Sequence, residues 1–107
     1  MQDEAVFEND ILGCVQELLI QYAAVLEDAN LKPVIQDFRK EGRGTEKYTS
    51  ELAICFYDGN RFFDVIEFFI YEHGKPVASK EETRAWLVDA LEDLLRRRKR
   101  LIRDTTH

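Results

Sequence analysis

The chain has 107 residues, a hydrophobic content of 45% and a formal net charge of −6. This length allows one domain with one core. The apolar content, with only two prolines and five glycines, excludes a disordered chain. We therefore expect a single domain over residues 1–107.

The sequence carries no sign of export or of a membrane span. Residues 1–10 combine neither a basic start nor an apolar run, and no stretch approaches the roughly 18 consecutive apolar residues of a membrane helix. Cys14 and Cys55 lie far apart, without the spacing of a redox motif, and two thiols are too few for a disulfide framework. We expect a cytoplasmic protein that contacts no membrane.

The net charge hides an uneven distribution. Six of the fifteen basic residues lie in the short segment 96–103. The rest of the chain has nine basic and 21 acidic residues, so its formal net charge is −12. A body of this charge repels nucleic acid and attracts basic partners.

A long amphipathic helix is predicted near the N-terminus. Its apolar residues recur at spacings of three and four: Ile11, Leu12, Val15, Leu18, Leu19, Tyr22 and Leu26. Its start is open, because either Asp3 or Asn9 can cap it and Gly13 weakens the first turns. Asn30 followed by Pro33 predicts its end.

Two strands are expected next. Residues 34–39 predict a short strand, and the two glycines of segment 41–45 predict a mobile turn. Residues 48–57 predict a second strand with one strongly apolar side, formed by Tyr48, Leu52, Ile54 and Phe56. Asp58-Gly59-Asn60 then predicts a tight hairpin, and loops of two and of three residues both fit, so its register stays open.

The third strand, residues 61–72, is apolar in both phases of strand alternation. One phase carries Phe62, Asp64, Ile66, Phe68 and Ile70, and the other carries Phe63, Val65, Glu67, Phe69 and Tyr71. Such a strand is typical of the centre of a fold, because neither side tolerates water.

A second helix is predicted from Ser79. The segment 73–76 breaks the strand before it, and Ser79 with Glu82 has the spacing of a capping box. The apolar stripe of this helix is Trp86, Leu87, Ala90, Leu91, Leu94 and Leu95. Its basic end covers residues 96–103, and residues 104–107 are expected to fray.

These elements predict an α+β fold of two layers, in the order helix, three-stranded antiparallel meander, helix. Three strands at about 4.8 Å span roughly 14 Å, a width that two helices of about 10 Å cover on one face. Either the helices divide between the faces, or a second protein molecule covers one face. We favour the second molecule, because four side chains of the third strand would form an exposed apolar patch. They are Phe63, Val65, Phe69 and Tyr71.

The carboxylates of the third strand invite comparison with metal-dependent nucleases. Such enzymes need converging carboxylates and a lysine, for which Asp64, Glu67, Glu51, Glu72 and Lys75 are the candidates. Asp64 and Glu67 lie three apart on a strand, so their side chains point to opposite faces. We expect no metal site and no cofactor.

The thiols and the glycine pair are equally weak as catalytic signals. Cys14 or Cys55 with His73 gives a nucleophile and a base, but nothing nearby in sequence lowers either thiol pKa. Gly42 and Gly44 lack the strand before and the helix after that a phosphate-binding loop needs. We expect no catalytic residue.

The basic run at 96–103 has two interpretations. Clustered arginines grip phosphates in nucleic-acid-binding proteins. The alternative is a solvated helix end, in which Glu92 pairs with Arg96 and Asp93 with Arg97. We favour the helix end and expect no nucleic-acid partner, because the body is acidic.

A binding protein is the function that these patterns favour. The first hypothesis is an inhibitor, such as a toxin-immunity (antidote) protein, whose acidic side chains cover the basic active site of a nuclease-like target. Its expected contacts are Glu46, Glu51, Asp58, Asp64, Glu67 and Glu72, with Tyr57 and Tyr71 as aromatic anchors. The alternative is a homodimeric adaptor or chaperone-like protein that pairs through Phe63, Val65 and Phe69. An enzyme is the interpretation with the least support.

Overall fold

The computed structural model describes residues 4–39 and 45–105. Its elements are α1 (Glu4–Gln21), α2 (Ala23–Asp28), β1 (Lys32–Arg39), β2 (Ser50–Asp58), β3 (Arg61–Glu72), β4 (Lys75–Pro76) and α3 (Lys80–Thr105). The predicted α+β class and the order of helix, meander and helix are confirmed. A short fourth strand, β4, was not expected. Most of the predicted turn at 41–45 lies outside the described residues.

The N-terminal helix is interrupted at Tyr22 and stops at the predicted place. Asn30 has a φ of 60°, the left-handed conformation that ends many helices. The backbone amides of Asn30 and Leu31 donate to the carbonyls of Glu27 and Leu26, both at 2.9 Å. Leu26 and Leu31, on either side of this cap, both belong to the buried core.

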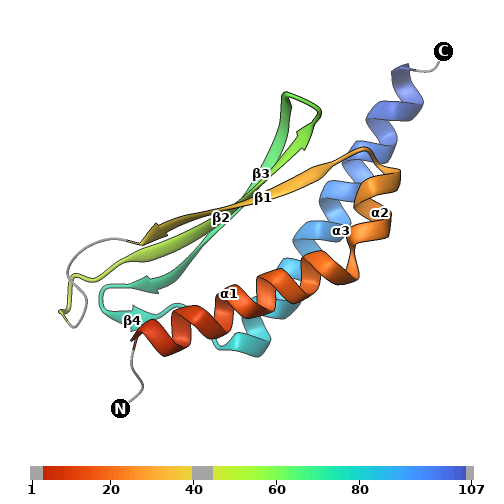
Figure 1. The fold of residues 1–107 in the computed structure, drawn as a ribbon. Coiled ribbons are helices and arrows are strands. Elements are labelled where there is room, and N and C mark those ends of the chain that lie inside the picture. Colours follow the sequence, from red (N-terminus) through yellow and green to blue (C-terminus); the bar gives the residue numbers. More distant parts are fainter. Residues whose placement is uncertain (1–3, 40–44, 106–107) are drawn as a thin grey trace.

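The sheet is an antiparallel meander with the strand order β1-β2-β3-β4 (Figure 1). Asp58 pairs with Arg61, so the loop of the β2–β3 hairpin has two residues. The sequence had left loops of two and of three residues open. Gly59 takes a φ of 60° in this loop, a conformation that glycine adopts without steric cost.

Strand β3 contains two irregularities that change which side chains share a face. The register with β2 shifts between Phe56 and Tyr57 and again between Ser50 and Glu51. At each shift β3 supplies one extra residue, first Phe63 and then Ile70, as in a β-bulge. The residues beyond each bulge are therefore out of phase with the middle of the strand.

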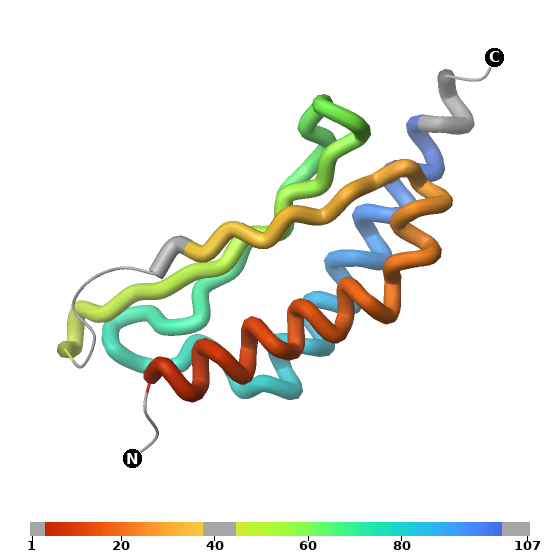
Figure 2. The backbone as a smooth tube through the Cα atoms, in the orientation of Figure 1, coloured from red at the N-terminus to blue at the C-terminus, as the bar shows by residue number. Residues whose placement is uncertain are grey.

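Both helices cover the same face of the sheet (Figure 1). They run side by side in the same direction, as the tube in Figure 2 shows, from the β4 end of the sheet towards the β2–β3 hairpin. The core between the layers joins both helices to the strands, through residues such as Ile11, Leu18, Ile54, Phe56, Ile66, Leu87 and Leu91. The other face of the sheet has no described element over it.

Helix α3 begins at the predicted capping box. The hydroxyl of Ser79 accepts from the amide of Glu82 at 3.1 Å, and the Glu82 carboxylate accepts from the amide of Ser79 at 3.2 Å. The helix continues to Thr105, two residues into the tail that was expected to fray. Residues 106–107 lie outside the described chain.

Candidate functional site

The sheet face turned away from the helices is the largest apolar surface that the fold leaves uncovered. Leu52, Ile54 and Phe56 point into the core, so the alternate residues of β2 point to the opposite side. Residues paired across antiparallel strands share a face, which places three cross-strand rows there: Lys32, Tyr57 and Phe62; Val34, Cys55 and Val65; Gln36, Ala53 and Glu67. Glu51 and Phe69 follow as a further pair.

We call this surface the open sheet face. Its floor is small, because Ala53 and Cys55 are buried among their neighbours without any element above them. Its rim is aromatic: Phe62 is 57% exposed and Phe69 is 41% exposed. Phe62 also contacts the ring of Tyr57 edge-on, with centroids 5.9 Å apart. A contiguous apolar patch of this kind marks an interaction surface more often than a solvated one.

The open face differs from the predicted patch in two residues. Val65 and Phe69 lie on it as expected, but the placement of Phe63 and Tyr71 beside them was wrong. Phe63 packs against the core under the guanidinium of Arg98, which lies 5.1 Å from the ring centroid. Tyr71 is buried between Phe7 and Tyr48. The bulges explain both, since each adds one residue to β3 and so shifts the alternation of its side chains between the two faces.

Two of the predicted acidic contacts instead tie the sheet to α3. Asp58 accepts from the Asn30 side chain at 2.8 Å and from Arg98 at 2.5 Å. Asp64 accepts from Arg97 and, at 2.8 Å, from the backbone amide of Val65. These carboxylates therefore hold the hairpin and β3 to the last turns of the long helix.

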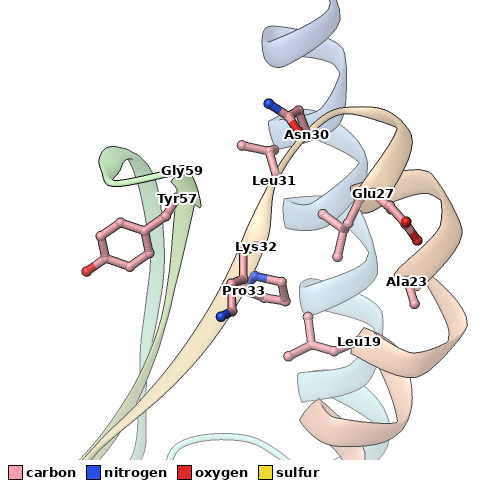
Figure 3. Close-up of a pocket in the computed structure, with 10 residues that line it drawn as sticks. Leu19, Ala23, Glu27, Asn30, Leu31, Lys32, Pro33, Tyr57 and Gly59 are labelled. Atoms are coloured by element: carbon pink, nitrogen blue, oxygen red, sulfur yellow. The ribbon is translucent and has the colours of Figure 1, made fainter.

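The remaining predicted contacts do not form one cluster. Glu67 is exposed and Glu51 half-buried on the open sheet face. Glu46 is exposed in the turn before β2, and Glu72 is exposed at the end of β3. Tyr57 lies on the open face, and Figure 3 shows its ring turned away from the helices.

The negative charge of the chain is concentrated on α1 and α2. Residues 1–29 contain seven acidic residues and no lysine or arginine, whereas residues 30–78 contain eight acidic and seven basic residues and residues 79–107 contain six acidic and eight basic residues. We call the exposed acids of α1 and α2 the acidic helix surface: Asp10, Glu17, Glu27 and Asp28. Ile20 stands three residues from Glu17 on α1 and is 76% exposed. An apolar side chain among charges is the usual anatomy of a binding surface.

The basic run is partly used inside the molecule. Arg97 pairs with Asp93 at 3.0 Å, the predicted i,i+4 contact, and also with Asp64. Arg98 donates to the Ala29 carbonyl at 3.0 Å as well as to Asp58. The arrangement is that of an anchored helix end, in which these arginines contact the sheet and the end of α2.

Glu92 takes a different partner from the predicted Arg96. Its carboxylate accepts from the hydroxyl of Tyr22 at 2.7 Å, across the α1–α3 junction. This hydrogen bond raises the pKa of Tyr22, since ionisation would remove the donated proton, and burial and the charge of Glu92 act in the same direction. Arg96 instead lies 3.9 Å from Asp93, three residues before it.

The structure does not bring together the residues that were considered as catalytic or metal-binding candidates. Asp64 faces the helices and Glu67 the open side, as their spacing predicted. Cys14 lies buried in α1 and Cys55 lies in the sheet, and burial raises the pKa of the Cys14 thiol, which keeps it protonated. Within residues 4–39 and 45–105, no three His, Cys, Asp or Glu side chains are placed to hold a metal ion.

A hollow of about 330 Å³ lies where the end of the helix layer meets β1 and the hairpin (Figure 3). Its floor is apolar, with Leu19, Leu26 and Pro33 among its lining residues. Asn30 and Lys32 also line it. Glu27, Lys32 and Tyr57 are the ionisable residues of its lining, and the other lining residues are neutral.

Two polar features of the fold have little or no signature in the sequence. Glu8 is 2% exposed and accepts from the Tyr48 hydroxyl at 2.7 Å. An acid three residues before Ile11 on the apolar stripe of α1 was the available signal. The cluster of Asn30, Asp58 and Arg98 had no local signal, because its members lie 28 and 40 residues apart in the chain.

Comparison of the chain with protein-family models, with curated proteins and with solved structures finds no match. In the part of the chain that the structure describes, none of the helices has the length and apolar character needed to cross a bilayer.

Proposed function

We propose that this chain is a non-catalytic protein-binding domain of the inhibitor or antidote type, and that it meets a basic protein through the acidic helix surface. The observation that carries the proposal is the uneven distribution of charge along the chain. Residues 1–29 hold seven acids and no lysine or arginine, while acids and bases nearly balance between residues 30 and 78 and bases exceed acids between residues 79 and 107. A basic target is therefore attracted to α1 and α2 and not to the sheet or to α3.

The proposed contact surface differs from the one expected from sequence. Asp58 and Asp64 are engaged by Arg98 and Arg97, so their charge is already compensated within the molecule. The acids of α1 and α2 lie exposed, and Ile20 and Val25 on the same two helices are 76% and 49% exposed. These two side chains offer apolar anchors at a surface whose charge steers the encounter.

The test compares two charge reversals of equal size. One triple variant carries Glu17→Lys, Glu27→Lys and Asp28→Lys on the helices, and its matched control carries Glu46→Lys, Glu67→Lys and Glu72→Lys on the sheet side. Each raises the net charge by six, and all six positions are exposed. Each protein is immobilised and exposed to an extract of the cells that express it, and the retained proteins are identified and eluted with rising salt.

The proposal predicts a retained protein of basic isoelectric point that the helix variant loses at least tenfold and the sheet variant keeps. It also predicts release by about 0.5 M salt, where the Debye length is only a few ångströms. Retention of neutral or acidic proteins alone would contradict it. So would loss of the basic protein from the sheet variant with retention by the helix variant.

A further inference from the structure

The open sheet face is a large surface of the described chain that carries few charges, so a second copy can approach it without strong repulsion. Two molecules of charge −6 repel each other, and the repulsion is greatest where α1 and α2 of one copy meet α1 and α2 of the other. The open face carries Lys32 against Glu51 and Glu67, and its other side chains are uncharged. Charge therefore directs a basic partner to the helices and leaves the sheet for a like-charged one.

The area of the open sheet face indicates whether a dimer formed through it is permanent or reversible. Strands β1 and β2 have eight and nine residues. With β3 they form a surface about 14 Å wide and about 27 Å long. This footprint of roughly 380 Å² underestimates the accessible surface of its side chains, yet it stays below the about 800 Å² that each partner buries in a standard interface. A pair of these faces suits a reversible dimer and not a permanent one.

The order of charges along the face selects one way of stacking. Lys32 lies in the row nearest the hairpin, and Glu51 lies at the other end of the face. If the two-fold axis runs along the strands, Glu51 of each copy meets Glu51 of the other. If the axis lies in the interface at right angles to the strands, the strands of the second copy run in the opposite direction. Lys32 of one copy then approaches Glu51 of the second, and Phe62 stacks on Phe69.

We propose that the chain forms a two-fold dimer in which the open sheet faces of two copies pack together with their strands antiparallel. Two sheets stacked in this way enclose an apolar layer about 10 Å thick, as in a β-sandwich. The dimer leaves both acidic helix surfaces outside. It is independent of the proposed function, because it uses the opposite face of the molecule.

Sedimentation equilibrium on the full chain between about 1 and 200 μM tests the dimer. The expected result is a mass that rises from 12.6 kDa towards twice that value, with a dissociation constant in the micromolar range. Phe69→Ser weakens association at least tenfold. Ile20→Ser, which removes a more exposed apolar side chain from α1, leaves it unchanged.

A charge exchange tests the orientation with variants that do not remove apolar surface. Lys32→Glu weakens the dimer by placing two acids together, and the double variant Lys32→Glu with Glu51→Lys restores it to within about threefold of the original dissociation constant. A monomer at 200 μM would overturn the proposal and leave the face to a different protein. A dimer lost through Ile20→Ser but not through Phe69→Ser would also overturn it, and the helix-variant experiment would stand in either case.

Discussion

Gly74 is held in a conformation and a space that no other residue fits. It follows β3 with a φ of 76°, and its amide donates to the Tyr48 carbonyl at 2.9 Å. A Cβ at this position would lie 2.6 Å from the backbone oxygen of Thr45. The turn into β4 is thus packed directly against the segment that leads into β2.

Gly74→Ala is therefore expected to lower the free energy of unfolding by at least about 2 kcal/mol, from left-handed strain and the clash together. Gly13→Ala is the matched control. Gly13 lies in α1, and a Cβ there would meet no atom within 4 Å, so alanine raises the stability by about 0.5 to 1 kcal/mol. Urea unfolding of the three proteins measures both, and equal effects of the two substitutions would contradict this account.

Two serines at the ends of elements differ in whether their hydroxyl has a partner. Ser79 caps α3 through its hydroxyl, whereas Ser50 at the start of β2 is fully buried. Among the described residues, nothing is placed to hydrogen-bond the Ser50 Oγ. A buried hydroxyl without a hydrogen-bond partner lowers the free energy of unfolding, whereas a hydroxyl that caps a helix raises it.

The same substitution at these serines is expected to have opposite effects. Ser79→Ala lowers the free energy of unfolding by about 1 kcal/mol, the usual value of an N-cap. Ser50→Ala leaves it unchanged or raises it by up to about 1 kcal/mol, because an unsatisfied group is removed. Thermal and urea unfolding give both values, and a loss above about 1 kcal/mol at Ser50 would show that its hydroxyl has a role in the fold.

Helix α3 is anchored by Arg98 more than by its neighbours. The Arg98 side chain is 13% exposed and contacts Asp58, the Ala29 carbonyl and the ring of Phe63. Lysine keeps the charge but cannot make this set of contacts, so Arg98→Lys is expected to cost about 1 to 3 kcal/mol. Arg96→Lys, at a side chain 67% exposed, stays within about 0.5 kcal/mol.

Chemical denaturation of these two variants distinguishes an anchored helix end from a solvated one. Equal stability of Arg98→Lys and the unmodified chain would mean that the last turns of α3 contribute little to the fold. A loss confined to Arg98 would confirm that the basic run includes a structural contact between α3 and the hairpin.

At the level of elements, sequence reasoning succeeded where local chemistry decides. The stop at Asn30, the hairpin at Gly59 and the start of α3 at Ser79 each depend on residues within a few positions. The bulges at Phe63 and Ile70 have no such signature, and the alternation rule assumes an uninterrupted period of two. That is why Phe63 was placed on the wrong face while Val65, between the bulges, was placed correctly.

For the whole molecule, composition predicted that the charge is uneven but not where it lies. The count of acids pointed to the sheet because the candidate strand carries many of them. Asp58 and Asp64 proved to be partners of α3, a fact set by contacts across 40 and 33 residues of chain. The remaining excess on the helices suggests two surfaces of different character on opposite faces of one small domain.

These two surfaces respond differently to salt, which separates the two proposals in a single series of measurements. Screening weakens attraction to a basic protein, but it also weakens repulsion between two acidic copies, while apolar burial is preserved. Rising salt is therefore expected to release the basic partner and to hold or strengthen the dimer.

The parallel course of α1 and α3 has a consequence for how the chain reaches its native state. Contacts between the N-terminal helices and α3, such as Gln21 with Arg84 and Tyr22 with Glu92, join residues 63 and 70 positions apart. The whole meander must first bring these distant segments together, at a cost in loop-closure entropy. We therefore expect α1 and α3 to dock on each other more slowly than the β2–β3 hairpin forms.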